Sequence, residues 1–217
     1  MPAILLYLLV CYLAGSVPFG FAAGLLAGHD VRREGSGNIG FTNVLRVCGK
    51  RWGFPVLLLD AFKGFAPVFW VAPLVMAPEM PDFHAQQALG GLMAIIGHSS
   101  PVWLRFRGGK GVATGAGVAA ALIPVPLLAA LAVWGLTVAI TRYVSLGSLI
   151  AAIASLATQL WLTWGACASA ENLPGLILAV AIAVLVWVRH RSNIARLLAG
   201  TENKFSLHKQ NPAPPAE

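Results

Sequence analysis

Three glycines surround a lysine in the segment Gly108 to Gly111, directly before a long apolar run. Backbone amides at the start of a helix carry partial positive charge, and Lys110 adds a full charge beside them, so the segment predicts an anion site and favours phosphate. It is not a Walker A loop, because glycine rather than serine or threonine follows Lys110. A basic membrane flank would explain Arg105 and Arg107, but it would not explain the glycines.

A second glycine-rich segment, GSGNIGFTNVLR, runs from Gly35 to Arg46. Its glycines free the backbone, while short polar side chains are supplied by Ser36, Asn38, Thr42 and Asn43. Such a segment can wrap an oxyanion. A turn-rich loop between two helices is an equally good interpretation of the composition alone.

A third polar segment, RHRSNIARLLAGTENK, follows the last apolar run. His190 and Asn193 are three residues apart, so they would face one site if the helix continues past the membrane. A basic flank that binds anionic headgroups would account for Arg189, Arg191 and Arg196, but it would leave the histidine and asparagine unexplained.

Two ionisable residues, Asp60 and Lys63, share a helix face within an apolar run, where such residues are functional by default. For Asp60 we expect a structural ion pair, and Lys63 could serve that role or contact substrate. His98 is more typical of a hydrogen-bonded structural residue than of a catalyst. No histidine has partners at metal-ligand spacing, so neither a metal site nor a cofactor is expected.

The composition places these segments in a membrane protein. The chain has 217 residues, of which 58% are hydrophobic and 11% charged, and its mean hydropathy is +0.75. These values exclude an ordinary soluble domain. The net charge of +7 could suggest nucleic acid, but the basic residues are spread among loops between apolar runs, so no nucleic-acid partner is expected.

The apolar runs predict an all-α, polytopic bundle of membrane helices. Candidate spans are Ala3 to Leu26, Phe54 to Met76, Ala85 to Leu104, Val112 to Ile140, Val144 to Trp164 and Leu173 to Val188. Treated as one helix, the long fourth run gives six spans and places Arg142 and the basic tail on opposite sides. A break at Ile123 to Pro126 gives seven.

Charge favours seven spans with the N-terminus outside and the C-terminus cytoplasmic. In that arrangement 14 of the 15 lysines and arginines are cytoplasmic, with Lys63 inside the membrane. The weak point of this arrangement is that it divides the fourth apolar run into two segments of roughly 14 residues each, which are short for a membrane crossing. We expect one integral membrane domain over residues 1–205, and a disordered cytoplasmic tail over 206–217, which is rich in proline and alanine.

The three polar segments together resemble the bacterial acyl-phosphate:glycerol-3-phosphate acyltransferases, the Y-type family. The resemblance rests on GSGN-x-G-x-TN-x-x-R, on GH-x-x-P followed by GGKGVAT, and on H-x-x-NI-x-RL-x-x-G-x-E, and it covers Gly15 to Lys204. Ile39 and Phe41 depart from the common pattern, in which proline and a small residue stand there.

The resemblance implies a seven-helix, multi-pass protein of the bacterial inner membrane with its active site facing the cytoplasm. The implied transferase reaction moves a fatty acyl group from acyl phosphate to the 1-hydroxyl of sn-glycerol 3-phosphate, giving lysophosphatidic acid and phosphate at the start of phospholipid synthesis. Matching residues are Ser36, Lys110, His190 and Asn193 as catalytic groups, and Asn38, Thr42, Arg46, Lys63, Gly108, Gly109, Gly111 and Ser145 as substrate-binding groups.

These residues suggest catalysis by positioning and charge stabilisation, because acyl phosphate is already activated and no Ser-His-Asp arrangement is evident. Lys110, the Gly108 to Gly111 amides, Ser36 and Thr42 would hold the donor's phosphate. Glycerol 3-phosphate would be held by Arg46, Lys63, His190 and Asn193. The proton could go to a substrate phosphate or to His190. The alternative function is an anion or organophosphate transporter, which would show internal repeats and polar sites at mid-depth.

Overall fold

The computed structural model describes residues 2–75, 82–164 and 173–205, and every regular element in these ranges is helical. The expected tail, 206–217, lies outside the described residues. The helices are α1 (Ala3–Ser16), α2 (Phe19–Leu26), α3 (Phe41–Cys48), α4 (Lys50–Ala66), α5 (Ala72–Val75), α6 (Phe83–Ser99), α7 (Val112–Leu122), α8 (Pro124–Thr141), α9 (Val144–Trp164), α10 (Leu173–Arg189) and α11 (Arg191–Leu198). A π-helical turn, Pro67–Val71, joins α4 to α5.

Within the described residues, four helical segments are long and apolar enough to cross a membrane: Ala3–Leu26, Lys50–Val75, Pro124–Thr141 and Val144–Trp164. A fifth crossing results if α10 and α11 are counted together, although they are bent by 57°. The chain therefore has the all-helical, multi-pass architecture that the sequence predicted. The helices α6 and α7, with 17 and 11 residues, are shorter than these four.

The expected break in the fourth apolar run occurs at Ile123, which ends α7 and precedes α8. Pro124 occupies the first turn of α8, where its missing amide costs no hydrogen bond and its ring prevents α7 from continuing. The two halves are unequal, with 11 and 18 residues, where the sequence suggested roughly 14 each. Only α8 is long enough to be counted as a span by itself.

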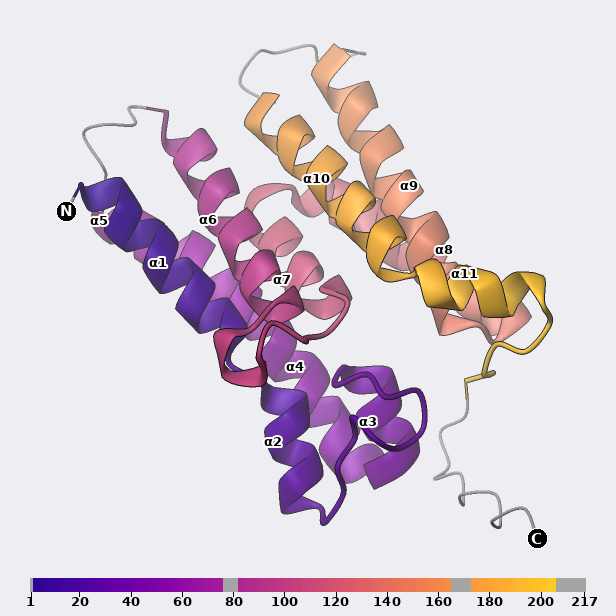
Figure 1. The fold of residues 1–217 in the computed structure, drawn as a ribbon. Coiled ribbons are helices and arrows are strands. Elements are labelled where there is room, and N and C mark those ends of the chain that lie inside the picture. The colour runs from indigo at the N-terminus through magenta and orange to yellow at the C-terminus, as the bar shows by residue number, and fades with distance from the viewer. Residues whose placement is uncertain (1, 76–81, 165–172, 206–217) are drawn as a thin grey trace, which may run out of the picture.

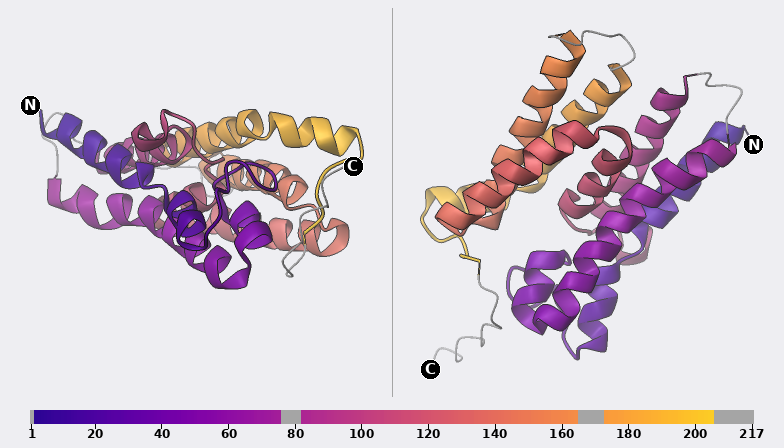
Figure 2. Two further views of the ribbon diagram at one scale, coloured as in Figure 1. Left: turned by 60° about the horizontal axis from the view of Figure 1, so that its bottom comes forward. Right: turned by 180° about the vertical axis from the view of Figure 1, so that it is seen from behind.

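The short helix α7 contacts α4, α6, α8 and α10, and Figure 2 shows the bundle from two further directions. An apolar cluster at the centre includes Val68, Ile95, Val118 and Leu178, which come from four different helical segments. Figure 1 shows α3 and α11 at one end of the bundle, whereas the first residues of α1 and α6 lie at the other end. The polar segments from distant parts of the sequence are thereby gathered at one end.

Candidate active site

A cavity of about 310 Å³ opens at the end of the bundle where α3 and α11 lie. Its interior is apolar and is lined by residues such as Ala119, Leu127, Leu131 and Ile182. Its mouth is polar and is lined by Ser36, Asn38, Thr42, Arg46, Lys110, Ser145, His190, Asn193, Arg196 and Glu202. A cavity of this kind can hold a molecule with an apolar chain and an anionic head.

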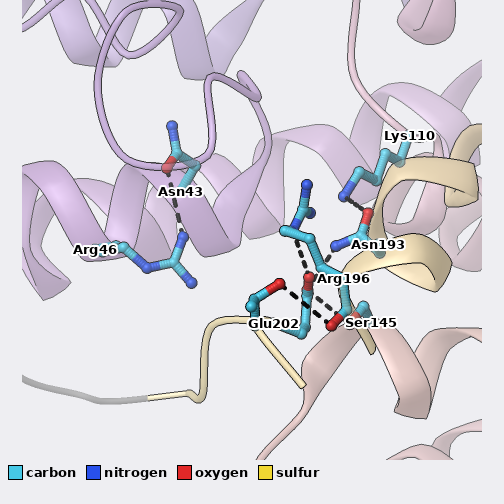
Figure 3. Close-up of polar contacts among 8 residues, drawn as sticks. Asn43, Arg46, Lys110, Ser145, Asn193, Arg196 and Glu202 are labelled. Carbon is cyan, nitrogen blue, oxygen red and sulfur yellow. Dashed lines mark hydrogen bonds and ion pairs between the residues drawn. The ribbon is translucent and has the colours of Figure 1, made fainter. Parts of the chain in front are cut away.

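A hydrogen-bonded network centred on Glu202 organises one wall of the mouth (Figure 3). Oε1 of Glu202 accepts from Ser145 Oγ at 2.8 Å and from Asn193 Nδ2 at 2.6 Å, and Oε2 accepts from Arg196 Nε at 2.7 Å. Because the carboxylate only accepts, the amide NH₂ of Asn193 must face it, so Asn193 Oδ1 is free to accept from Lys110 Nζ. Glu202 thereby fixes the orientation of Asn193.

Lys110 stands between neighbouring charges of both signs. The pKa of Lys110 is lowered to about 8, mainly by burial and also by the charges of Arg196, Arg46 and Arg189, whereas Glu202 opposes the shift. Burial also lowers the pKa of Arg46. Burial alone would raise the pKa of Glu202, but its hydrogen bonds from Asn193, Ser145 and Arg196 prevail and hold that pKa below its ordinary value.

The first polar loop is folded around the amide of Asn43, a buried residue of α3. Asn43 Nδ2 donates to the carbonyls of Val31 at 2.9 Å and Glu34 at 3.0 Å, while Oδ1 accepts from the Ser36 amide at 2.7 Å. Gly35 must be glycine, because φ is +61° and a Cβ would lie 2.3 Å from Asn43 Oδ1. Asn43 is therefore a structural residue that sets Ser36 at the mouth of the cavity.

The loop that carries Lys110 is held by Arg189. Its Nη2 donates to the carbonyls of Ser99, Gly108 and Gly109 at 3.0, 3.2 and 2.9 Å. The amides of Gly108 and Gly109 donate to the carbonyls of Ser99 and His98 at 3.2 and 3.1 Å.

Protein carbonyls thus accept from the Gly108 and Gly109 amides, which the sequence was expected to place around a phosphate. Neither residue lines the cavity, whereas Gly111 does. Gly111 has φ +80° and precedes α7, whose first residues, Val112 and Ala113, also line the cavity. The helix N-terminus beside Lys110 remains available as an anion site.

The helix does not continue straight past the last apolar run, which was the condition under which His190 and Asn193 were expected to face one site. The chain bends by 57° between α10 and α11, and His190 lies at the bend. His190 and Asn193 are nevertheless 3% and 4% exposed, and both line the cavity. His190 Nδ1 lies 2.7 Å from the Val186 carbonyl, which only accepts, so Nδ1 carries the proton and Nε2 of the neutral ring is an acceptor.

Lys63 is buried but does not line the cavity. Its Nζ lies 2.8 Å from Asp60 Oδ1 and donates to the Val17 carbonyl at 2.7 Å. Asp60 and His98 do line the cavity, and His98 Nδ1 lies 3.7 Å from Asp60 Oδ1. The structure thus favours the ion-pair interpretation of Asp60, and it places Lys63 behind the site rather than in it.

Sequence reasoning assigned no role in the site to Glu202 and treated Arg196 as part of a basic flank. Both line the cavity and are paired with each other. The motif H-x-x-NI-x-RL-x-x-G-x-E, which includes both residues, was the available signal, but a spacing of six residues did not indicate that they would meet. Gly200, with φ +70°, turns the chain after α11 and allows Glu202 to reach back to Arg196.

The chain is similar to proteins of known activity. The sequence matches the family described as glycerol-3-phosphate acyltransferase over residues 5–200. It is 45% identical over 197 residues to the glycerol-3-phosphate acyltransferase of Desulfotalea psychrophila, covering 91% of this chain and 95% of that protein. It is 46% identical over 198 residues to that of Myxococcus xanthus, covering 91% and 97%.

Two crystal structures of PlsY (YgiH), an integral membrane glycerol 3-phosphate acyltransferase, have the same fold. The glycerol 3-phosphate form superposes with a TM-score of 0.81 at 38% identity, and the lysophosphatidic acid form with 0.78 at 37%. Each comparison covers 94% of this chain and 96% of the other.

Proposed function

Because this chain belongs to the glycerol-3-phosphate acyltransferase family, we propose that its cavity transfers a fatty acyl group from acyl phosphate to the 1-hydroxyl of sn-glycerol 3-phosphate. The chain is an integral membrane enzyme of phospholipid synthesis that makes lysophosphatidic acid. Family membership decides against the transporter alternative. The donor, the position acylated and the roles of individual residues are the further steps of the proposal.

The observation that carries the proposal is one cavity in which a cationic mouth leads into an apolar interior. The donor is an acyl chain joined to a phosphate through the reacting carbonyl. If the chain lies among residues such as Ala119 and Leu127, its phosphate is at the level of Lys110 and the start of α7. We therefore assign the scissile bond to the boundary between the two parts.

Acyl transfer from this donor needs no covalent enzyme intermediate. The hydroxyl oxygen of glycerol 3-phosphate bonds to the acyl carbon, the bond from that carbon to the phosphate oxygen breaks, and phosphate leaves with the electron pair. The proton lost by the hydroxyl balances the proton that the released phosphate takes up. Lys110, Ser36 and the α7 N-terminus stabilise the negative charge on the leaving phosphate.

We assign the second substrate to the part of the mouth nearest α3 and α9. Arg46 and Thr42 bind its phosphate, with Asn38 and Ser145 as further polar contacts. His190 Nε2, an acceptor in the neutral ring, accepts a hydrogen bond from the attacking hydroxyl and orients its lone pair. Asn193 holds Lys110 in place. Lys63 and the amides of Gly108 and Gly109 are left out of this assignment, because other groups of the protein already engage them.

We further propose seven crossings, with the N-terminus outside and the active site facing the cytoplasm. The crossings are α1 with α2, α4 with α5, α6, α7, α8, α9 and α10. Ser145 at the start of α9 shares one hydrogen-bonded network with Lys110, which supports placing both on one side of the membrane. A single helix through Ile123 would place them on opposite sides. The positive-inside rule supports the cytoplasmic side.

Donor selectivity tests the proposed function. Coenzyme A carries a nucleotide and further phosphates that would have to be held outside the bilayer, where the loops of this chain are short, and a thioester offers Lys110 no phosphate leaving group. Purified enzyme is incubated with glycerol 3-phosphate and either palmitoyl phosphate or palmitoyl-CoA at matched concentrations, and lysophosphatidic acid is measured. We expect product from palmitoyl phosphate together with equimolar phosphate release. Efficient use of the CoA ester, with palmitoyl phosphate inert, would overturn the proposal.

A further inference from the structure

A second cavity, of about 350 Å³, adjoins the first one. Four residues line both cavities: Ser36, Asn38, Lys110 and Arg196. These side chains form a partition with one face toward the acyl-binding cavity and the other toward the second cavity. A small ion bound at Lys110 therefore has access to either side.

The second cavity is strongly cationic. Besides Lys110 and Arg196, its lining includes Arg189 and Arg191, and no carboxylate is among the described residues that line it. The Arg189 guanidinium is fixed by its hydrogen bonds to the carbonyls of the lysine loop. Arg191 and its neighbour Ser192 are exposed to solvent, so the positive charge continues from half-buried Lys110 to the surface. Such a lining attracts a small anion and connects it to water.

We propose that the second cavity is the exit site for inorganic phosphate, the leaving group of the reaction. This inference rests on the proposed function, in which acyl phosphate is the donor. Breaking the bond between the acyl carbon and the phosphate oxygen releases phosphate beside Lys110, which lines both cavities. The ion then needs only to pass the Lys110 side chain to meet Arg191 and Ser192.

A separate exit resolves a problem of crowding. After transfer, the first cavity holds lysophosphatidic acid, whose chain fills the apolar interior and whose phosphate occupies the mouth near Arg46. Phosphate leaving by the same mouth would have to pass a second anion. The second cavity offers a route lined with cations. Of the residues assigned to the acceptor, only Asn38 lines it, whereas Arg46, Thr42 and Ser145 do not.

Product inhibition tests this inference, because inorganic phosphate added to the medium can occupy the second cavity and oppose release of the phosphate that the reaction forms. Initial rates of lysophosphatidic acid formation from palmitoyl phosphate are measured in neutral detergent without anionic lipid, at increasing inorganic phosphate and at several glycerol 3-phosphate concentrations. The variants are Arg191→Gln, which removes a charge found only in the second cavity, and Arg191→Lys, which retains it. Arg107→Gln removes an exposed cytoplasmic charge that lines neither cavity and controls for net charge.

We expect Arg191→Gln to raise the inhibition constant for phosphate about threefold or more, the modest effect of one exposed charge, while the KM for glycerol 3-phosphate stays within about twofold. Arg191→Lys and Arg107→Gln should keep the wild-type inhibition constant. An unchanged constant in Arg191→Gln would overturn the exit site. The exit site would also be overturned if the KM for glycerol 3-phosphate rose as much as the inhibition constant for phosphate, because the second cavity would then bind the acceptor. Wild-type enzyme that makes no product from palmitoyl phosphate would instead refute the proposed function itself.

Discussion

The charge of Lys110 should set the alkaline limit of the enzyme. Burial lowers the pKa of this amine to about 8, and only the protonated form binds the phosphate. The charged fraction is then about nine-tenths at pH 7, about half at pH 8 and about one-tenth at pH 9, so kcat/KM should fall roughly tenfold for each pH unit above 8. Phosphate groups lose their second proton near pH 6, so substrate ionisation does not produce this limb.

The assay is the initial rate of lysophosphatidic acid formation at subsaturating palmitoyl phosphate between pH 6.5 and 9.5, corrected for spontaneous hydrolysis of the donor. Lys110→Arg provides the comparison, because a guanidinium stays charged throughout this range. The residual activity of this variant should not show the fall in kcat/KM above pH 8. Arg107→Gln, a matched loss of positive charge outside the site, should retain it. A Lys110→Arg enzyme that keeps the wild-type limb would refute the assignment, as would a wild-type profile that stays flat to pH 9.5.

Four further predictions concern the same elements. Lys110→Ala should lower kcat/KM by a factor of about 10 to 150, as expected for a charge-assisted contact of about 1.5 to 3 kcal/mol, and near-normal turnover in a folded variant would remove Lys110 from the site. Gly109→Ala should lower activity, because the new Cβ would lie 2.0 Å from His98 Nε2. Gly135→Ala should not lower it, because no atom lies within 4 Å of a Cβ at that position, and equal activities of the two variants would contradict the packing argument. Glu202→Gln should lower the free energy of unfolding by about 1 to 3 kcal/mol, measured by thermal unfolding in detergent, and an unchanged stability would mean that the network does not anchor the chain after α11. For the topology, cysteine introduced at Arg142 in a background without Cys11, Cys48 and Cys167 should react with an impermeant thiol reagent only from the cytoplasmic side; labelling from outside would exclude seven crossings.

The parts of the fold that follow from local chemistry could be predicted from the sequence. Runs of apolar residues gave the helices, and Pro124 gave the break after Ile123, because a proline interrupts a helix whatever surrounds it. Charge asymmetry suggested that the polar segments meet on one face. The structure brings Ser36, Lys110, His190 and Asn193 to one cavity, in agreement with that expectation.

The direction of the hydrogen bonds in the lysine loop could not be predicted. A glycine-rich segment before a helix leaves open whether its amides or its carbonyls are occupied by the protein. The orientation of these groups depends on Arg189, which is 80 residues from Gly109 in the sequence. Because a guanidinium only donates, it engages the carbonyls of Gly108 and Gly109. The position of Glu202 in the site could not be predicted either, because it depends on the bend after α10 and on the turn at Gly200.

Glu202 explains how several cations can lie close together in a site before anionic substrates bind. Arg46, Lys110 and Arg196 all line the mouth of one cavity, where their mutual repulsion is less screened than in water. A carboxylate among them lowers this cost, but it could also repel the substrates. The geometry avoids this repulsion. Ser145, Asn193 and Arg196 all donate to the Glu202 oxygens, so these donors compensate the negative charge on that wall of the cavity. Two of the three cations, Lys110 and Arg46, remain without a carboxylate bonded to them among the described residues, one for each phosphate in the proposed reaction. A protein that binds its substrates through their phosphates has to keep such charges available, and Glu202 stabilises the arrangement without neutralising the groups that do the binding.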